Sequence, residues 1–264
     1  FKKYTPEIVS VVLDKHFRIE GSPDHPVVCN RNGNDEIVTL SELTQKDKLK
    51  VFSTEKQWPV TKEVSIPQPK KQCTNKKSGE KYTIPLTINT DIARLFGYLV
   101  SEGNICGSHM IEFCNTDIDI CNDYNNIFEK LFSCKPSMRG VYKSDEQRKG
   151  RKQCYSLYKS SIDIRNVLVL TGLSRRKSRE KEIPWSILQS PKYVIKEFLM
   201  ALFEGDGSVS ISDGKLEVCY DTSSPKLADQ VQQLLLIFGI YSSRHGASSQ
   251  RCIKVRMHGQ NARF

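Results

Sequence analysis

The chain has 264 residues, of which 38% are hydrophobic and 27% charged, a composition typical of a globular protein with a sizeable core. No apolar run approaches the roughly 20 residues of a membrane span, and the charged start does not resemble a secretory signal. Its 40 Lys and Arg against 30 Asp and Glu leave a net charge of +10, which favours an acidic partner. We expect an intracellular, cytoplasmic protein with no membrane partner, whose nine cysteines are reduced thiols without zinc.

Residues 1–66 are predicted to be rich in β-strands. Runs of β-branched and apolar residues place strands at residues 8–13, 16–20 and 26–29. Asn32-Gly33 is a turn signal. Residues 67–90 are rich in proline and lysine, so we expect them to link this segment to the rest of the chain.

From residue 91 the chain is predicted to contain one structural unit twice, at residues 91–190 and 191–264. Helices at 91–101 and 193–204 open the two units. In the first unit the expected order continues with strands near 104 and at 110–114, a helix at 118–132, a strand at 153–158 and a helix from 162. In the second unit it continues with strands at 208–212 and 215–220, a helix at 225–238 and a strand at 252–257. The second unit is expected to be incomplete at its C-terminal end.

Two further sequence matches support this duplication. The run CYSLYKSS in the first unit resembles CIKVRMHG in the second. Glu112-x-Cys114 is predicted to correspond to Glu217-x-Cys219. Two unrelated segments rarely share both an order of elements and residues in register.

The opening helices end alike, in LFGYLVSEG at residues 95–103 and LMALFEGDG at residues 199–207. Core packing alone would explain their apolar positions, but not an acid at the same final position of both. Small residues four apart let two helices approach closely, which would bring the two acids together beside the negative ends of two helix dipoles. A divalent cation would relieve their repulsion, and Mg²⁺, with Mn²⁺ as a substitute, prefers such oxygen ligands. The predicted metal site comprises Glu102, Asp206, Gly205 and Ser101.

The positive charge is concentrated in residues 135–181, which hold 14 Lys and Arg against 4 Asp and Glu. A solvated surface would account for a charge run, but an excess of this size on one segment favours a nucleic-acid partner. Phosphate contacts would supply affinity, and strand side chains at alternate positions would read base edges. The predicted DNA contacts are Arg148, Lys149, Arg151, Lys152, Lys159, Arg175, Arg176, Lys177, Lys215, Arg251, Lys254 and Arg256.

On the two motifs LFGYLVSEG and FLMALFEGDGSV, the chain resembles the LAGLIDADG homing endonucleases of the monomeric, two-motif type. The resemblance implies an α+β fold, a duplicated αββαββα unit with pseudo-two-fold symmetry whose sheets sit on the DNA major groove. It implies that Glu102 and Asp206 bind the metal and that Lys181, in KEIPWSIL, is the active-site lysine. It also implies a monomer that cuts both strands of double-stranded DNA at a long asymmetric site. The matching lysine of the second unit is expected to lie past Phe264.

The N-terminal segment resembles the internal block of an intein splicing domain of the Hint type, around Ser22 and His25. In that block a Thr-x-x-His pattern activates a peptide bond, and Ser22 stands in place of the threonine. The printed sequence shows neither the nucleophile nor the final His-Asn of an intein, so we expect a piece of an endonuclease-bearing intein that does not splice alone. Two alternatives remain: a nucleic-acid-binding derivative without cleavage, such as an RNA maturase, and an autoprocessing domain.

Overall fold

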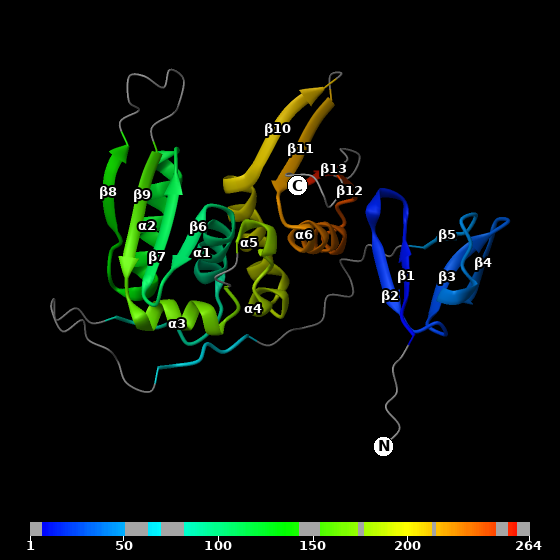
Figure 1. The fold of residues 1–264 in the computed structure, drawn as a ribbon, viewed down its shortest axis with the longest axis horizontal. Coiled ribbons are helices and arrows are strands. Elements are labelled where there is room, and N and C mark those ends of the chain that lie inside the picture. The colour runs from blue at the N-terminus through cyan, green and yellow to red at the C-terminus, as the bar shows by residue number, and fades with distance from the viewer. Residues whose placement is uncertain are drawn as a thin grey trace.

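The computed structural model describes residues 7–50, 63–69, 82–142, 154–173, 177–212, 215–246 and 253–257. Two helices, α1 (Thr90–Ser101) and α5 (Lys192–Asp206), pack against each other, and an antiparallel sheet lies to either side of them (Figure 1). A separate β-rich segment lies beside the second sheet. The mixed α and β class predicted from the sequence is confirmed. Within the described residues, no helix is long and apolar enough to cross a membrane.

The first half of the duplicated region runs from α1 to α3. After α1 come β6 (Gly103–Cys106), β7 (Met110–Asn115), α2 (Ile118–Phe132), β8 (Ser137–Tyr142), β9 (Cys154–Ser160) and α3 (Ile162–Leu170). The strands form a sheet in the order β6-β7-β9-β8. The short α4 (Trp185–Leu188) then leads into the second half.

The second half repeats this topology. After α5 come β10 (Gly207–Ser212), β11 (Lys215–Thr222), α6 (Pro225–Ile237), β12 (Ser242–His245) and β13 (Ile253–Met257), in the sheet order β10-β11-β13-β12. The identical strand order confirms the predicted duplication. Sequence patterns had not indicated β8 and β12, which are edge strands of the two sheets.

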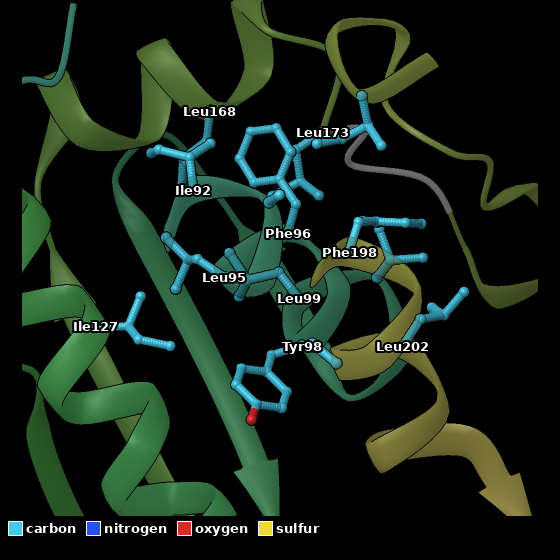
Figure 2. Close-up of a cluster of buried hydrophobic side chains, with 14 of the residues drawn as sticks. Ile92, Leu95, Phe96, Tyr98, Leu99, Ile127, Leu168, Leu173, Phe198 and Leu202 are labelled. Carbon is cyan, nitrogen blue, oxygen red and sulfur yellow. The ribbon is translucent and has the colours of Figure 1, made fainter. Parts of the chain in front are cut away.

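The core forms because both helices of the pair are apolar on the sides that meet each other and the sheets. Figure 2 shows this cluster, which includes Ile92, Leu95, Phe96, Leu99, Phe198 and Leu202. Asn89 starts α1 by accepting a hydrogen bond from the Ile92 amide at 3.0 Å, an N-cap arrangement that satisfies one free donor of the first turn. In β7 burial alternates, so that Ile111 and Phe113 face the helices and their neighbours face away.

The sheet register shows which residues of the two halves correspond. Each hairpin starts at the glycine that follows the acid of the motif. Gly103 pairs with Phe113, and Gly207 pairs with Tyr220. Both aromatic side chains are fully buried, so Tyr220 is the counterpart of Phe113.

This register overturns the predicted correspondence of Glu112-x-Cys114 with Glu217-x-Cys219. The residue after Phe113 is Cys114, and the residue after Tyr220 is Asp221, so Cys114 and Asp221 are counterparts. The prediction was wrong by two residues because β10 and β11 have 6 and 8 residues whereas β6 and β7 have 4 and 6. The longer second hairpin displaces the sequence pattern along the strand.

The N-terminal segment is β-rich, as predicted for this part of the chain. It contains β1 (Val9–Val12), β2 (Arg18–Gly21), β3 (Pro26–Arg31), β4 (Asn34–Thr39) and β5 (Lys48–Leu49). β3 and β4 join at Asn32 and Gly33, whose φ angles of 53° and 91° are those of a primed hairpin turn. The segment contacts the second half, where Phe17 stacks on Tyr241 with ring centroids 5.8 Å apart.

Part of the predicted linker is packed against the first half. Ser65 and Thr87 form a β-bridge, and the Ile88 amide donates to the Val64 carbonyl at 2.8 Å. Ile66 and Ile88 are buried in the main core. Tyr82, Ile84 and Ile88 alternate with polar residues and pack into or against the core, which explains why this part of the predicted linker is not an exposed connection.

Candidate active site

The α1–α5 contact depends on small residues, as their spacing predicts. A Cβ atom on Gly97 would lie 2.5 Å from the carbonyl oxygen of Phe198 and 2.7 Å from the Cβ of Ala201. A Cβ atom on Gly205 would overlap Ser101 and lie 3.6 Å from the Cγ of Glu102. Any larger residue at these two glycines would push the helix axes apart, so the close approach fixes how near the helix ends lie.

The two acids of the motifs sit at the C-terminal ends of this helix pair. Glu102 is the C-cap of α1, and Asp206 is the last residue of α5. Burial raises the pKa of Asp206 to about 6, with a further contribution from the negative charge of Glu102. Burial also raises the pKa of Glu102. The structure therefore brings the two predicted carboxylates into one partly buried site, where the charge of Glu102 acts on Asp206.

Lys181 lies at the same place and is held by both halves. Its Nζ atom donates to the carbonyl oxygens of Val100 at 2.6 Å and Ser101 at 2.8 Å, which are free acceptors at the end of α1. Its own carbonyl accepts a hydrogen bond from Ser224 Oγ at 2.6 Å, at the start of α6. Burial lowers the pKa of Lys181, while the charges of Asp206 and Glu102 act in the opposite direction. One ammonium group thus sits beside two carboxylates.

The other two predicted metal ligands do not present side-chain oxygens to the site. The Ser101 hydroxyl donates back to the carbonyls of Gly97 at 3.2 Å and Tyr98 at 3.1 Å in its own helix. The Ser101 carbonyl accepts from Lys181. Gly205 serves the helix contact by having no side chain. Across the described ranges, no cluster of three or more His, Cys, Asp or Glu side chains is arranged to hold a metal ion.

A third carboxylate, which the sequence did not indicate, belongs to the second half of the site. The charge of Asp221 raises the pKa of Asp206 further. Asp221 is also 3.8 Å from the ammonium of Lys254 and accepts a hydrogen bond from Ser208 at 3.5 Å. The two-residue error in aligning the halves hid this residue, because it paired Asp221 with a threonine beyond the strand instead of Cys114 at the corresponding strand position.

Two predicted DNA contacts lie on the face of the second sheet that points away from α6. In β13, Val255 and Met257 are buried against the core, so the alternating residues Lys254 and Arg256 face the other way. Arg256 forms an ion pair with Glu217 of β11 at 3.4 Å. Both of these cations are thus already near acids on this face of the sheet.

Lys159 is not brought together with those cations. It pairs in register with Ile111, whose side chain is buried under the helices, so both point to the helix-covered side of the first sheet. Its Nζ atom donates to the Lys135 carbonyl at 3.2 Å and lies 5.4 Å from the centroid of the Tyr82 ring. The sequence predicted that Lys159 lies on a strand that contacts DNA, but it did not predict which face of the sheet the side chain occupies.

The remaining predicted positions are dispersed. Lys177 is exposed just before the short turn that leads to Lys181, and Lys215 opens β11. Ser22 and His25 form a turn in the N-terminal segment, where the His25 amide donates to the Ser22 carbonyl at 3.0 Å. Seven predicted contacts lie outside the described residues: Arg148, Lys149, Arg151, Lys152, Arg175, Arg176 and Arg251.

A family model described as a LAGLIDADG-like domain matches residues 194–258. Among curated proteins, the chain is 42% identical over 92 residues to the A subunit of DNA gyrase from Mycobacterium gordonae, which is 33% of this chain and 17% of that protein. It is 31% identical over 172 residues to a DNA polymerase of Thermococcus litoralis, covering 62% of this chain and 9% of the polymerase. The chain therefore spans less than a fifth of the length of these relatives.

Among solved structures, the chain resembles the N-terminal LAGLIDADG domain of DUF199/WhiA, with a TM-score of 0.45 and 13% identity over 65% of this chain and 75% of that one. It also resembles I-DmoI in complex with DNA and Mn, with a TM-score of 0.43 and 12% identity over 63% of this chain and 88% of that one. The family match begins within α5 and ends with β13, so it covers the second half as the structure divides the chain. That half therefore matches a LAGLIDADG-like domain, the type of domain that the sequence motifs predict.

Proposed function

We propose that the chain is a site-specific DNA endonuclease of the LAGLIDADG type, which hydrolyses phosphodiester bonds in both strands of a long asymmetric site. It would act as a monomer, because both acids come from one chain and meet at its internal pseudo-two-fold axis. One observation carries the proposal: Glu102 and Asp206 end the two packed helices, and the Lys181 ammonium sits beside them.

The donor set fits a divalent cation such as Mg²⁺, with Mn²⁺ as a substitute. Two partly buried carboxylates lie at the negative ends of two helices, and burial raises the pKa of each, so their charge is under-compensated in the protein alone. Glu102 and Asp206 would hold the ion, and water and phosphate oxygens would complete its shell, as is usual for Mg²⁺. When bound, such an ion supplies a water of lowered pKa and stabilises charge on the reacting phosphate.

The chain's own residues would orient the substrate and balance its charge. Lys181 is fixed by two carbonyl acceptors of α1, so its ammonium needs no rearrangement to face a phosphate group. The hydrogen bond from Ser224 to the Lys181 carbonyl ties that position to the second half. Lys181 would thus stabilise negative charge developing on the phosphate while keeping the end of α1 in place.

The sheet faces that point away from α2 and α6 would contact DNA. Lys254 and Arg256 lie on that face of the second sheet, at alternate positions of one strand. Positions at this spacing can reach base edges in the major groove, while the basic stretch of residues 135–181 would supply phosphate contacts. Asp221 and Glu217 would have to release Lys254 and Arg256 for such contacts.

The pattern of relatives supports an origin as an inserted element, such as an intein. The chain matches a small part of three differently named proteins: the A subunit of gyrase, a DNA polymerase, and the replication factor C small subunit of Methanocaldococcus jannaschii, of which it covers 10%. A segment shared by different proteins and confined to a small share of each is the pattern that a mobile insert produces.

The proposal is tested by offering the chain a library of double-stranded DNA with a randomised central region and Mg²⁺, and by sequencing the ends that are cut. The selected site is then cut with the parent chain, Glu102→Gln and Asp206→Asn. We expect cleavage at one long site by the parent, and loss of cleavage with retained DNA binding in both variants. Asp119→Asn, on the surface of α2, is the matched control and should cut normally.

Three outcomes would overturn the proposal. Cleavage that neither substitution changes would come from another site or a contaminant. DNA binding by the parent without cutting would favour the alternative of an inactive binding protein. Selective binding of a structured RNA over DNA would favour a maturase.

A further inference from the structure

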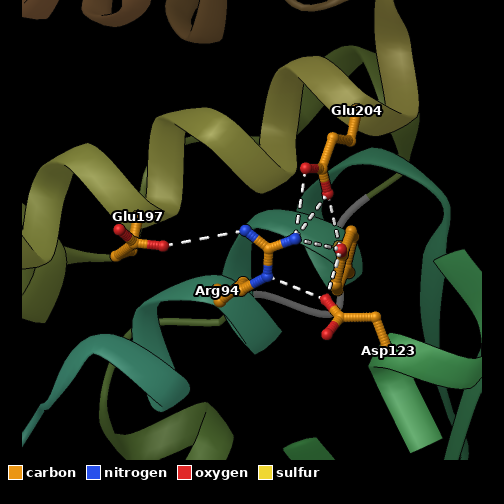
Figure 3. Close-up of polar contacts among 5 residues, drawn as sticks. Arg94, Asp123, Glu197 and Glu204 are labelled. Carbon is orange, nitrogen blue, oxygen red and sulfur yellow. Dashed lines mark hydrogen bonds and ion pairs between the residues drawn. The ribbon is translucent and has the colours of Figure 1, made fainter.

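One arginine on the side of the helix pair is surrounded by three carboxylates. Figure 3 shows Arg94 of α1 between Asp123 of α2 and Glu197 and Glu204 of α5. Tyr98 of α1 also accepts a hydrogen bond from Arg94. The Arg94 Nε atom is 2.8 Å from Asp123, its Nη2 atom 3.0 Å from Glu204, and its Nη1 atom 3.6 Å from Glu197. We call these five residues the Arg94 cluster.

Tyr98 completes the cluster from inside the core. Its ring is fully buried, and its hydroxyl lies 2.7 Å from Asp123 and 2.5 Å from Glu204. Arg94 Nη2 also donates to this hydroxyl at 3.0 Å. Burial and the two carboxylates raise the pKa of Tyr98, so the phenol keeps its proton at every working pH. The cluster thus joins three helices and both halves through one guanidinium and one phenol.

The cluster exists on only one side of the helix pair. In the aligned motifs the counterparts of Arg94, Tyr98 and Glu204 are Phe198, Leu202 and Val100. All three counterparts are buried and apolar. Apolar contacts are non-directional, whereas the two-pronged hydrogen bonding of a guanidinium to a carboxylate has a fixed geometry. The Arg94 cluster therefore adds to the close helix contact a directional restraint on the rotation of α5 about its axis.

On both helices, the acid of the site lies a short distance along the chain after a residue of the Arg94 cluster. Arg94, Tyr98 and Glu102 are four residues apart, so they lie on one face of α1 in successive turns. Glu204 is two residues before Asp206 at the end of α5. A rotation or slide of α5 that breaks the Glu204 contacts would move Asp206 relative to Glu102.

We propose that Arg94 and Tyr98 are positioning residues, which set the separation of the Glu102 and Asp206 carboxylates by holding Glu204. This inference rests on the proposed nuclease function for its activity measurement, but its geometric content is independent of that function. The Tyr98 carbonyl accepts a hydrogen bond from the Glu102 amide at 3.0 Å, which continues the backbone of α1. The Arg94 and Tyr98 side chains bind the carboxylates of Asp123 and Glu204, so their effect would be on placement of the site and not on DNA binding.

The test compares charge-balanced variants. Arg94→Gln with Glu204→Gln removes one positive and one negative charge, so the net charge is unchanged, and Tyr98→Phe removes only the hydroxyl. The matched control is Arg244→Gln with Asp229→Asn, which breaks another partly buried arginine–carboxylate pair, between β12 and α6. For each we would measure the unfolding temperature, the DNA dissociation constant, the single-turnover cleavage rate at the selected site, and the amide chemical shifts of Gly103 and Gly207, which follow the two acids.

We expect the Arg94–Glu204 variant to cut on the order of a hundredfold more slowly and Tyr98→Phe about tenfold more slowly, with DNA affinity unchanged, because small misplacements of reacting groups have effects of this size. Both should shift the amide signals of Gly103 and Gly207. The control should lower the unfolding temperature similarly but change neither the rate nor those signals. Equal rates in the parent and cluster variants, or the same loss in the control, would overturn the proposal.

The outcome separates this inference from the proposed function. If the parent cuts no DNA, the nuclease proposal fails, yet the amide signals still report whether the cluster positions the ends of α1 and α5. Unmoved signals in both cluster variants would refute the positioning role whatever the parent's activity.

Discussion

The two halves of the duplicated region have the same strand order but differ in where they place polar residues. Their sheets read β6-β7-β9-β8 and β10-β11-β13-β12, and each begins with a helix that ends in an acid. At corresponding positions, however, the residues differ. Arg94 of the first half corresponds to Phe198 of the second, and Cys114 corresponds to Asp221. The repeated apolar positions are therefore enough to specify the same fold in both halves. The polar positions are free to diverge, so the two halves contribute different polar residues to the shared site.

The halves also differ in what faces the outer side of their sheets. In the second half Lys254 and Arg256 lie on the outer face beside Asp221 and Glu217. In the first half the predicted Lys159 points to the helix side instead. Strand register decides this, because neighbouring residues on a strand face opposite sides.

In the α1–α5 contact, a substitution that makes the first half more like the second should disrupt the packing of the two helices. Gly97 corresponds to Ala201, yet Gly97→Ala would place its methyl group 2.5 Å from the Phe198 carbonyl oxygen and 2.7 Å from Ala201. We expect a loss of about 3 kcal/mol or more in the free energy of unfolding, measured by urea denaturation, since the obstacle is largely backbone. This is the largest effect we predict.

Two controls sharpen that result. Gly107→Ala meets no atom within 4 Å but has a φ of +57°, so it should cost only about 1–2 kcal/mol of backbone strain. Combining Gly97→Ala with Ala201→Gly should recover part of the loss, because the contact with Phe198 remains. Full tolerance of Gly97→Ala would show that the helices can separate without cost.

Lys181 comes from the first unit, and its ammonium lies beside the two acids of the shared site. Lys181→Met should slow cleavage on the order of a hundredfold, because it removes a preorganised cation. It should also cost about 2 kcal/mol of stability, because the carbonyls of Val100 and Ser101 lose their donor. Single-turnover cleavage and urea denaturation give the two values. Lys226→Met, which breaks the ion pair of the exposed Lys226 with the half-buried Glu182, should leave the rate unchanged, and an equal loss of rate there would remove any special role of Lys181.

These residues also show how far the sequence could predict the structure. The helix at Ile118–Phe132 and the two acids were predictable, because apolar periodicity and the repeated motif are local signals. The edge strands β8 and β12 were not, since they are defined by pairing with β9 and β13 and not by an apolar pattern of their own. The Arg94 cluster was also out of reach, since it joins residues about 110 apart in sequence through contacts that only tertiary packing brings together.

The two acids occupy equivalent positions, and burial raises the pKa of both, that of Asp206 to about 6 from the usual 3.8. In the folded state Asp206 therefore keeps its proton to higher pH than in the unfolded state, so stability falls as the pH rises from about 4 through about 6. Asp206→Asn removes this loss. We expect the variant to be about 2 kcal/mol more stable than the parent at pH 8, with no such advantage below the usual pKa.

Urea denaturation at pH 8, 6 and 4 measures this pH dependence. Glu36→Gln, an exposed residue of β4, is the control and should change stability little at any pH. Added Mg²⁺ should narrow the difference at pH 8, because it binds the parent's ionised carboxylate and not the amide. A constant difference between Asp206→Asn and the parent at all three pH values would mean that burial does not hold the proton on Asp206.

The outer faces of the two sheets give the smallest predicted difference. Glu217 holds Arg256 at 3.4 Å, so Glu217→Gln should free one cation for a phosphate and steepen the salt dependence of DNA binding by about one charge. Lys159→Gln should leave that dependence unchanged, because the Lys159 ammonium lies on the helix side near Tyr82. Binding to a labelled duplex at several salt concentrations measures both slopes. If Lys159→Gln flattened the slope and Glu217→Gln did not change it, the first sheet and not the second would carry the phosphate contacts, and the assignment of faces from strand register would have to be reversed.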